Sequence, residues 1–220
     1  MYSAFRNSAK TNTSRQTVCV VPFPTGNMPL SLQTTPSAAF SPLPYSAATR
    51  FITYPHSANC SMLCDIILNT DTIRLLNNHL QTTSVSQNRK KWERELATDN
   101  TRREAQAVQD AAETLHENFV KRAFQTDSIC QLATASPHPV LVCGDFNSLP
   151  SSYTYHRLSE SLKDGFKTGG HGYMYTYRYG KRMLRIDYAF HSPELECTDY
   201  YSPNLDLCSD HNPVIFTVKY

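Results

Sequence analysis

The feature that most restricts the fold of this 220-residue chain is an uninterrupted apolar run, Pro139–Cys143, which stops at Gly144-Asp145-Phe146-Asn147. A short continuous apolar run is typical of a strand that is buried on both faces of its sheet. We therefore expect a sheet with this strand in its interior. Its carboxyl end is expected to carry polar side chains.

Two patterns before this run predict further elements. The apolar runs Leu63–Leu68 and Ile73–Leu76 are separated by the turn-type tripeptide Asn69-Thr70-Asp71, which predicts a β-hairpin. A helix is predicted from Asp99 or Asn100 to about Phe124. Its apolar residues at the spacing of one helical face are Val108, Ala112, Leu115 and Phe119. The charged residues of the opposite face are expected to be solvated.

The remainder of the chain predicts strands with interspersed helices. A helical segment is expected over Ser152–Leu162, and strands over Tyr173–Tyr177, Met183–Phe190 and Pro213–Val218. Together with the earlier elements they predict the α/β class, as a sandwich built from about 160 residues.

The beginning of the chain has a different amino-acid composition. Of its first fifty residues twenty are Ser, Thr or Pro, and six prolines between Pro22 and Pro44 leave no room for a helix or a central strand. We therefore expect residues 1–58 to be disordered or non-native and residues 59–220 to form the folded domain.

Composition limits the function classes. The chain has 21 Lys and Arg against 19 Asp and Glu, which argues against a coating of nucleic acid or anionic lipid over the whole surface. No apolar run approaches the 18 or so residues of a membrane span, and Val18–Val21 is too short for a signal peptide. We expect a monomer in the cytoplasm. The seven cysteines show no zinc-site spacing and are expected to be reduced.

Polar residues gather at the expected strand ends. Asp145 and Asn147 are two apart in extended backbone, so they face the same side. In Arg185-Ile186-Asp187-Tyr188, Arg185 and Asp187 project together by the same rule. Two further clusters are Asn77-Asn78-His79-Leu80 and Ser209-Asp210-His211-Asn212-Pro213.

Each cluster alone has a structural interpretation, such as an Asx turn, a surface salt bridge or a cap. Together they supply three carboxylates, an amide and histidines at strand ends. That combination is what metal-assisted hydrolysis of a phosphoester needs.

The four clusters, in this chain order and strand context, resemble the signatures of the endonuclease/exonuclease/phosphatase superfamily, over roughly Cys60 to Tyr220. The resemblance implies a deoxyribonuclease I-like fold, which is an α/β two-sheet sandwich flanked by helices, here incomplete at the N-terminus. It also implies hydrolysis of a phosphoester by an activated water with Mg²⁺ or Mn²⁺. The partner would be a nucleic acid, a phospholipid headgroup or a small phosphoester, and the sequence does not separate these.

The resemblance also assigns catalytic roles. His211 would activate the attacking water or stabilise the transition-state phosphorane, and Asp187 would orient the imidazole. Asp145 would position or help to deprotonate the water. His79 would contact the scissile phosphate and protonate the leaving oxygen.

The remaining roles concern binding. Asn147, Asn78 and Arg185 would contact the substrate, with Asn147 on a phosphate oxygen. Asp210 would bind the cation directly or through water. Oxygen ligands prefer a hard cation, so zinc is a poor candidate.

Two family elements are missing. The family carries an Asn on its first strand and a Gln-Glu pair, both before the strand that ends at His79. Here no early Asn follows an apolar strand, and the first glutamate is Glu93. Two interpretations stay open: residues 1–58 are an out-of-frame or replaced segment, or they are a native disordered tail. The loss of a main metal ligand also leaves an alternative function, that of a catalytically inactive phosphate-binding remnant.

Substrate signals are weaker. The candidate basic elements are Arg89-Lys90-Lys91, Arg102-Arg103 and Lys181-Arg182, and such runs are usually solvated. Tyrosines alternate from Tyr173 to Tyr179. They either offer stacking surfaces for bases or cover one side of a sheet.

Overall fold

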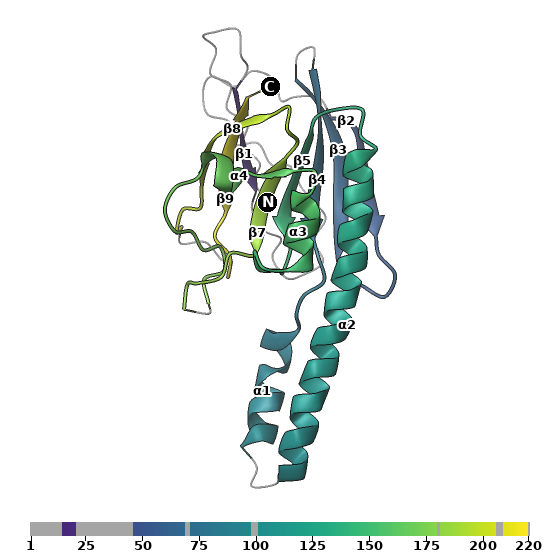
Figure 1. Cartoon of the computed structure of the whole chain (residues 1–220), viewed down its shortest axis with the longest axis vertical. Coiled ribbons are helices and arrows are strands. Elements are labelled where there is room, and N and C mark those ends of the chain that lie inside the picture. The colour runs from purple at the N-terminus through teal and green to yellow at the C-terminus, as the bar shows by residue number, and fades with distance from the viewer. Residues whose placement is uncertain are drawn as a thin grey trace.

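The computed structural model describes residues 15–20, 46–68, 71–97, 101–179, 181–205 and 209–219. The described residues form two sheets and four helices, with loops between them (Figure 1). The large sheet has the strand order β2-β3-β4-β5-β7-β6 and the small sheet has the order β1-β9-β8. The two-sheet α/β class expected from the sequence is therefore confirmed.

The strands of the large sheet are antiparallel except for the β4–β5 pair, which is parallel. Their bounds are β2 (Ser46–Thr53), β3 (Cys60–Leu68), β4 (Asp71–His79), β5 (Val140–Asp145), β6 (Lys163–Asp164) and β7 (Asp187–His191). The small sheet contains β1 (Arg15–Val20), β8 (Glu196–Tyr201) and β9 (Val214–Lys219). The helices are α1 (Val85–Leu96), α2 (Thr101–Thr134), α3 (Tyr153–Ser159) and α4 (Gly165–Gly169).

The core lies on both faces of the large sheet. Between the two sheets, Leu141 and Cys143 of β5 share a cluster with Phe216 of β9. On the opposite face, Val142 shares a cluster with side chains of α2 and α3, among them Ile129. Every residue of β5 is buried, as expected of an interior strand whose sequence is continuously apolar.

The β-hairpin is confirmed and is longer than predicted. Strands β3 and β4 pair from Ser61↔Asn78 to Leu68↔Asp71, so the ladder extends beyond the apolar runs on which the prediction rested. Residues 69 and 70 of the predicted turn lie outside the described residues. The extension carries β4 to His79, which places that residue at the end of the strand.

The predicted long helix is present, but the side chains that it buries differ from the expected face. Val108 and Phe119 are 59% and 52% exposed, whereas the buried side chains include the polar Arg122 and Gln125. Figure 1 shows the reason: the first half of α2 runs beside α1 away from the sheets, and only its second half reaches them. Contacts with the rest of the fold, rather than the apolar pattern, select the buried face.

Three other predicted elements need correction. The segment 173–177 forms no strand, only isolated bridges from Tyr177 to Leu184 and to His211. Strand β7 begins at Asp187, four residues later than Met183. Helix α3 covers seven residues and ends at Ser159, before the predicted end at Leu162. In the last two cases the alternation or periodicity in the sequence extends beyond the hydrogen-bonded element.

Strands β1 and β2 lie within the segment 1–58, for which we expected disorder, so that expectation is wrong for these two stretches. Both are edge strands, and both lie outside the interval from Pro22 to Pro44. Their positions therefore agree with the prediction that this proline-rich interval contains no central strand. Strand β2 pairs with β3 across the expected domain boundary, with Thr53 opposite Cys60. The other residues before position 46 lie outside the described ranges.

None of the described helices combines the length and the apolar character that crossing a membrane requires.

Gly144 sits at the tightest approach of β4 and β5. Its φ is +127°, and a Cβ there would lie 1.9 Å from the carbonyl oxygen of Asn78. Only glycine tolerates this backbone and this contact. The close approach brings the ends of β4 and β5 together.

We predict that Gly144→Ala lowers the free energy of unfolding by about 3 kcal/mol or more, because strain adds to the clash with backbone. Gly172→Ala is the matched control, since Gly172 also has a positive φ but has open space around it. It should cost about 1 kcal/mol. Urea unfolding of both variants measures the difference, and equal costs would contradict the packing argument.

Candidate active site

The register of three strands lines up three polar residues in one row. His79 ends β4, Asp145 ends β5 and Asp187 begins β7, and the pairings are His79↔Asp145 and Asp145↔Asp187. Asp187 shares this edge because β7 is antiparallel to β5. Residues in register across a sheet point to the same face. The three side chains therefore converge on the side that faces the small sheet.

The fourth residue, His211, lies in the segment that leads into β9 of the small sheet. Its Nδ1 lies 2.8 Å from Asp187 Oδ2, a hydrogen bond that joins the two sheets. Its Nε2 lies 3.9 Å from Asp145 Oδ2. The Nε2 of His79 lies 3.8 Å from the same oxygen. The structure thus brings together all four residues that we expected to be catalytic.

Asp187 and burial set the protonation of the site. Burial lowers the pKa of His211, but the hydrogen bond and the charge of Asp187 outweigh it and raise the pKa to about 9. Burial, followed by the charge of Asp187, raises the pKa of Asp145 above its ordinary value of 3.8. Burial and the charge of His211 lower the pKa of His79. These directions favour a cationic His211 beside a neutral His79.

Asn147 supports Asp145. Its backbone N–H donates to Asp145 Oδ1 at 2.8 Å, and its amide donates to Asp145 Oδ2 at 3.2 Å and to the Leu80 carbonyl at 3.1 Å. Its φ is +48°, a left-handed conformation that Asn tolerates better than most residues. The strand-end geometry therefore places Asn147 in the site, with its amide nitrogen already bonded within the protein.

Two residues that we expected to bind substrate occupy internal positions. The amide of Asn78 is fully buried and donates to the carbonyls of Leu76 and Cys143, which ties β4 to β5. The guanidinium of Arg185 pairs with both carboxylate oxygens of Asp164 at 3.1 and 2.8 Å. Because β7 begins at Asp187, the alternation that was to place Arg185 beside Asp187 does not hold. We therefore leave Asn78 and Arg185 out of the proposed contacts.

Asp210, the expected metal ligand, has an exposed side chain next to the site. The three groups whose ligand atoms lie within 4.8 Å of one another are Asp145, Asp187 and His211. The charge of Asp210 still contributes to raising the pKa of both Asp145 and His211. The structure therefore places Asp210 at the rim of this group.

Sequence reasoning missed three residues around the site. Thr176 hydrogen-bonds to the backbone of Asp187, and the ring of Tyr177 meets the edge of His211 with centroids 5.1 Å apart. Arg122 donates to the carbonyl of Gln81, and burial lowers its pKa to about 10, although the charge of Asp145 opposes that shift. Only the alternating tyrosines were a signal for this segment, and nothing in the sequence distinguished Arg122.

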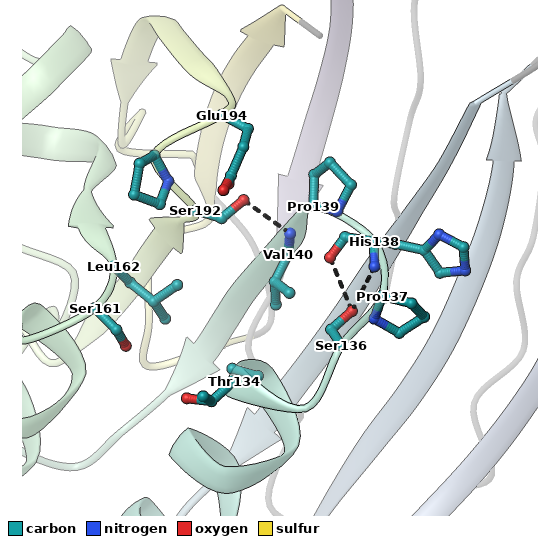
Figure 2. Close-up of a pocket in the computed structure, with 12 residues that line it drawn as sticks. Thr134, Ser136, Pro137, His138, Pro139, Val140, Ser161, Leu162, Ser192 and Glu194 are labelled. Atoms are coloured by element: carbon teal, nitrogen blue, oxygen red, sulfur yellow. Dashed lines mark hydrogen bonds between the residues drawn. The ribbon is translucent and has the colours of Figure 1, made fainter.

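A hollow of about 360 Å³ lies at the other end of β5 (Figure 2). Val140, the first residue of that strand, lines it and donates to the hydroxyl of Ser192. His138 and Glu194 also line it. None of the converging residues borders this hollow, so it is separate from the candidate site.

Comparison with known proteins agrees with this geometry. Residues 75–211 match the Endonuclease/Exonuclease/phosphatase family. The match covers more than half of the chain and includes His79, Asp145, Asp187 and His211, so the chain belongs to this family. No curated protein matches the chain.

Solved structures show the same fold. A functionally unknown conserved protein from Enterococcus faecalis V583 has 13% identity and a TM-score of 0.56, over 80% of this chain and 67% of that one. Truncated Caenorhabditis elegans TDP2 has 16% identity and a TM-score of 0.53, over 82% and 68%. The human Nocturnin catalytic domain with bound sulfate has 15% identity and a TM-score of 0.52, over 80% and 60%.

We predict that Asp145 and His211 together contribute stability to the metal-free chain that falls as the pH rises from about 4 to about 9. The folded state raises the pKa values of Asp145 and His211, so it holds their protons more tightly than the unfolded state does. The stabilisation is complete below the unfolded pKa values and is lost as the pH rises through the folded ones.

Asp145→Asn should flatten this dependence, because its side chain no longer titrates. Urea unfolding across the pH range measures the slope for each variant. Asp199→Asn, an exposed position on β8, is the control and should keep the parental slope. A parental slope in Asp145→Asn would contradict the assignment.

Proposed function

We propose that the chain is a divalent-metal-dependent phosphoester hydrolase, of the phosphodiesterase or nuclease type, that uses an activated water. The observation that carries the proposal is the 2.8 Å hydrogen bond from His211 to Asp187, with Asp145 3.9 Å from the other imidazole nitrogen. Membership of the family supports phosphoester hydrolysis as the reaction class.

The raised pKa values of Asp145 and His211 suit the two residues to different tasks. A carboxylate whose pKa is raised is a stronger base, so Asp145 is suited to take a proton from the water. An imidazolium held by Asp187 is suited to donate a hydrogen bond from Nε2 to a phosphoryl oxygen as charge develops there. Of the two roles that we expected for His211, the raised pKa favours stabilisation of the phosphorane.

His79 and Asn147 complete the proposed phosphate contacts. The pKa of His79 is lowered, so at neutral pH its imidazole is neutral and donates a single N–H toward the leaving oxygen. Asn147 holds Asp145 through two hydrogen bonds. We propose that Asn147 contacts phosphate only through the hydrogen-bonding capacity of its amide that these bonds leave unused.

A cation fits the donor set. Asp187 Oδ1 is buried and has no hydrogen-bond partner among the described residues, and Asp145 lies beside it with a raised pKa. Carboxylate oxygens are the ligands that Mg²⁺ or Mn²⁺ prefers, and a bound cation would favour the ionised form of Asp145. Asp145 and Asp187 would hold the ion, with Asp210 at the rim. When bound, it would polarise a phosphoryl oxygen.

The missing glutamate affects the affinity of the site for a cation rather than the geometry of the site. The described residues before Glu93 offer no glutamate, and Mg²⁺ depends on one or two protein carboxylates to anchor it. We therefore propose weak cation binding. The alternative, an inactive phosphate-binding remnant, predicts binding of phosphate with no turnover.

We predict that the parent hydrolyses a bis-aryl phosphodiester in the presence of Mg²⁺ or Mn²⁺, and that His211→Ala and Asp187→Asn each lower kcat about 10²-fold or more. Initial rates with purified protein measure this. Asp199→Asn should retain parental kcat. Rates unchanged in both site variants would overturn the assignment, and phosphate binding with no hydrolysis would favour the remnant.

We predict that millimolar Mn²⁺ or Mg²⁺ raises the melting temperature of the parent, because a ligand that binds only the folded state stabilises it. The rise should be absent in Asp187→Asn and retained in Asp199→Asn. Differential scanning fluorimetry with and without EDTA measures it. An equal rise in all three proteins would place the ion elsewhere.

A further inference from the structure

The segment that the sequence predicted as a strand runs instead between the two halves of the site. It bridges to Leu184, ahead of β7, and to His211, ahead of β9, in both cases through Tyr177. Its neighbour Thr176 is fully buried. The backbone N–H of Thr176 donates to the Leu184 carbonyl at 2.9 Å, and its carbonyl accepts from the N–H of Asn212 at 2.7 Å.

The hydroxyl of Thr176 makes the second connection. Its Oγ1 accepts the backbone N–H groups of Ile186 and Asp187, each at 3.0 Å. These two bonds use both acceptor positions of a hydroxyl. Strand β6 pairs with β7 only opposite Phe190 and His191, so at Asp187 the hydroxyl stands where a neighbouring strand would continue.

One residue therefore bonds to Asp187 and to the residue next to His211. The side chain of Thr176 fixes the backbone of Asp187, and its main chain fixes Asn212, the residue next to His211. Asp187 begins β7 of the large sheet and His211 precedes β9 of the small sheet, so their hydrogen bond depends on how those sheets meet. A shift of a few tenths of an ångström at Asp187 changes a 2.8 Å bond directly.

We propose that Thr176 is a positioning residue that sets the Asp187–His211 hydrogen bond. It acts through Asp187 and touches neither water nor phosphate. The inference rests on the proposed hydrolase function for its kinetic consequences, whereas its structural consequence can be observed without activity.

Substitution separates the hydroxyl from the volume of the side chain. Thr176→Val keeps the shape and removes the acceptor, and Thr176→Ser keeps the hydroxyl. We expect Thr176→Val to lower kcat about 10-fold or more with KM within about 3-fold, because an interaction needed in the transition state is weakened. Thr176→Ser should recover most of the activity. Thr154→Val, a buried threonine whose hydroxyl bonds to Thr126 between α3 and α2, is the control.

The second measurement is spectroscopic. In protein with ¹⁵N-labelled histidine, the Nδ1 proton of His211 should give a downfield resonance, assigned by its absence in His211→Asn. The resonance should persist in Thr176→Ser and Thr154→Val and be shifted or lost in Thr176→Val. A parent that shows the resonance but no hydrolysis would end the proposed function and leave the positioning test intact.

Three results would overturn the inference. One is a Thr176→Val protein with parental kcat and an unchanged resonance. Another is equal loss in Thr176→Val and Thr154→Val, which indicates a general packing effect. If Thr176→Val does not fold, Thr176→Ala against Thr176→Ser decides, since these differ only in the hydroxyl. The third result is failure of Thr176→Ala to fold, because a contribution to stability would then account for the hydrogen bonds of Thr176 without a positioning role.

Discussion

The hydrogen bond between His211 and Asp187 is the contact on which the rest of the site depends, because it joins the first residue of β7 in the large sheet to the segment that leads into β9 of the small sheet. Register alone aligns His79, Asp145 and Asp187 along one edge of the large sheet. His211 enters that row only because β9 packs against the large sheet through the cluster that contains Phe216. The apolar core between the sheets therefore determines whether a polar dyad exists at their edge.

The same contact creates an electrostatic conflict that defines the site's chemistry. Asp187 stabilises the imidazolium of His211 and, through its charge, disfavours ionisation of Asp145. A buried carboxyl beside another carboxylate is costly unless positive charge is supplied. Some of that charge comes from His211, which lowers the pKa of Asp145 against the larger effect of burial. A divalent cation would supply more, which is why the site is expected to lose stability with rising pH when it is metal-free.

Much of this arrangement could be predicted from the sequence, because local spacing encodes it. Asp145 follows an apolar run that must be an interior strand, so its place at a strand end follows directly. Arg185 was misplaced because the alternation rule holds only inside a strand, and β7 begins two residues later. The buried face of α2 was wrong because Arg122 and Gln125 bond to a loop. Thr176 was missed because it lies in a segment that forms no strand, and the residues that its hydroxyl contacts, Ile186 and Asp187, are 10 and 11 residues away in the sequence.

The polar face of α2 shows how a covering helix also becomes part of the site. Gln125 accepts from the backbone N–H of Gln81 at 2.8 Å, and Arg122 donates to the carbonyl of the same residue at 2.6 Å. The preceding residue, Leu80, donates its N–H to the Asp145 carbonyl. The two residues that follow His79 are thus held by the sheet and by the helix, respectively. A buried polar face is costly unless each group is satisfied, so these bonds fix the helix at one position against the strand end.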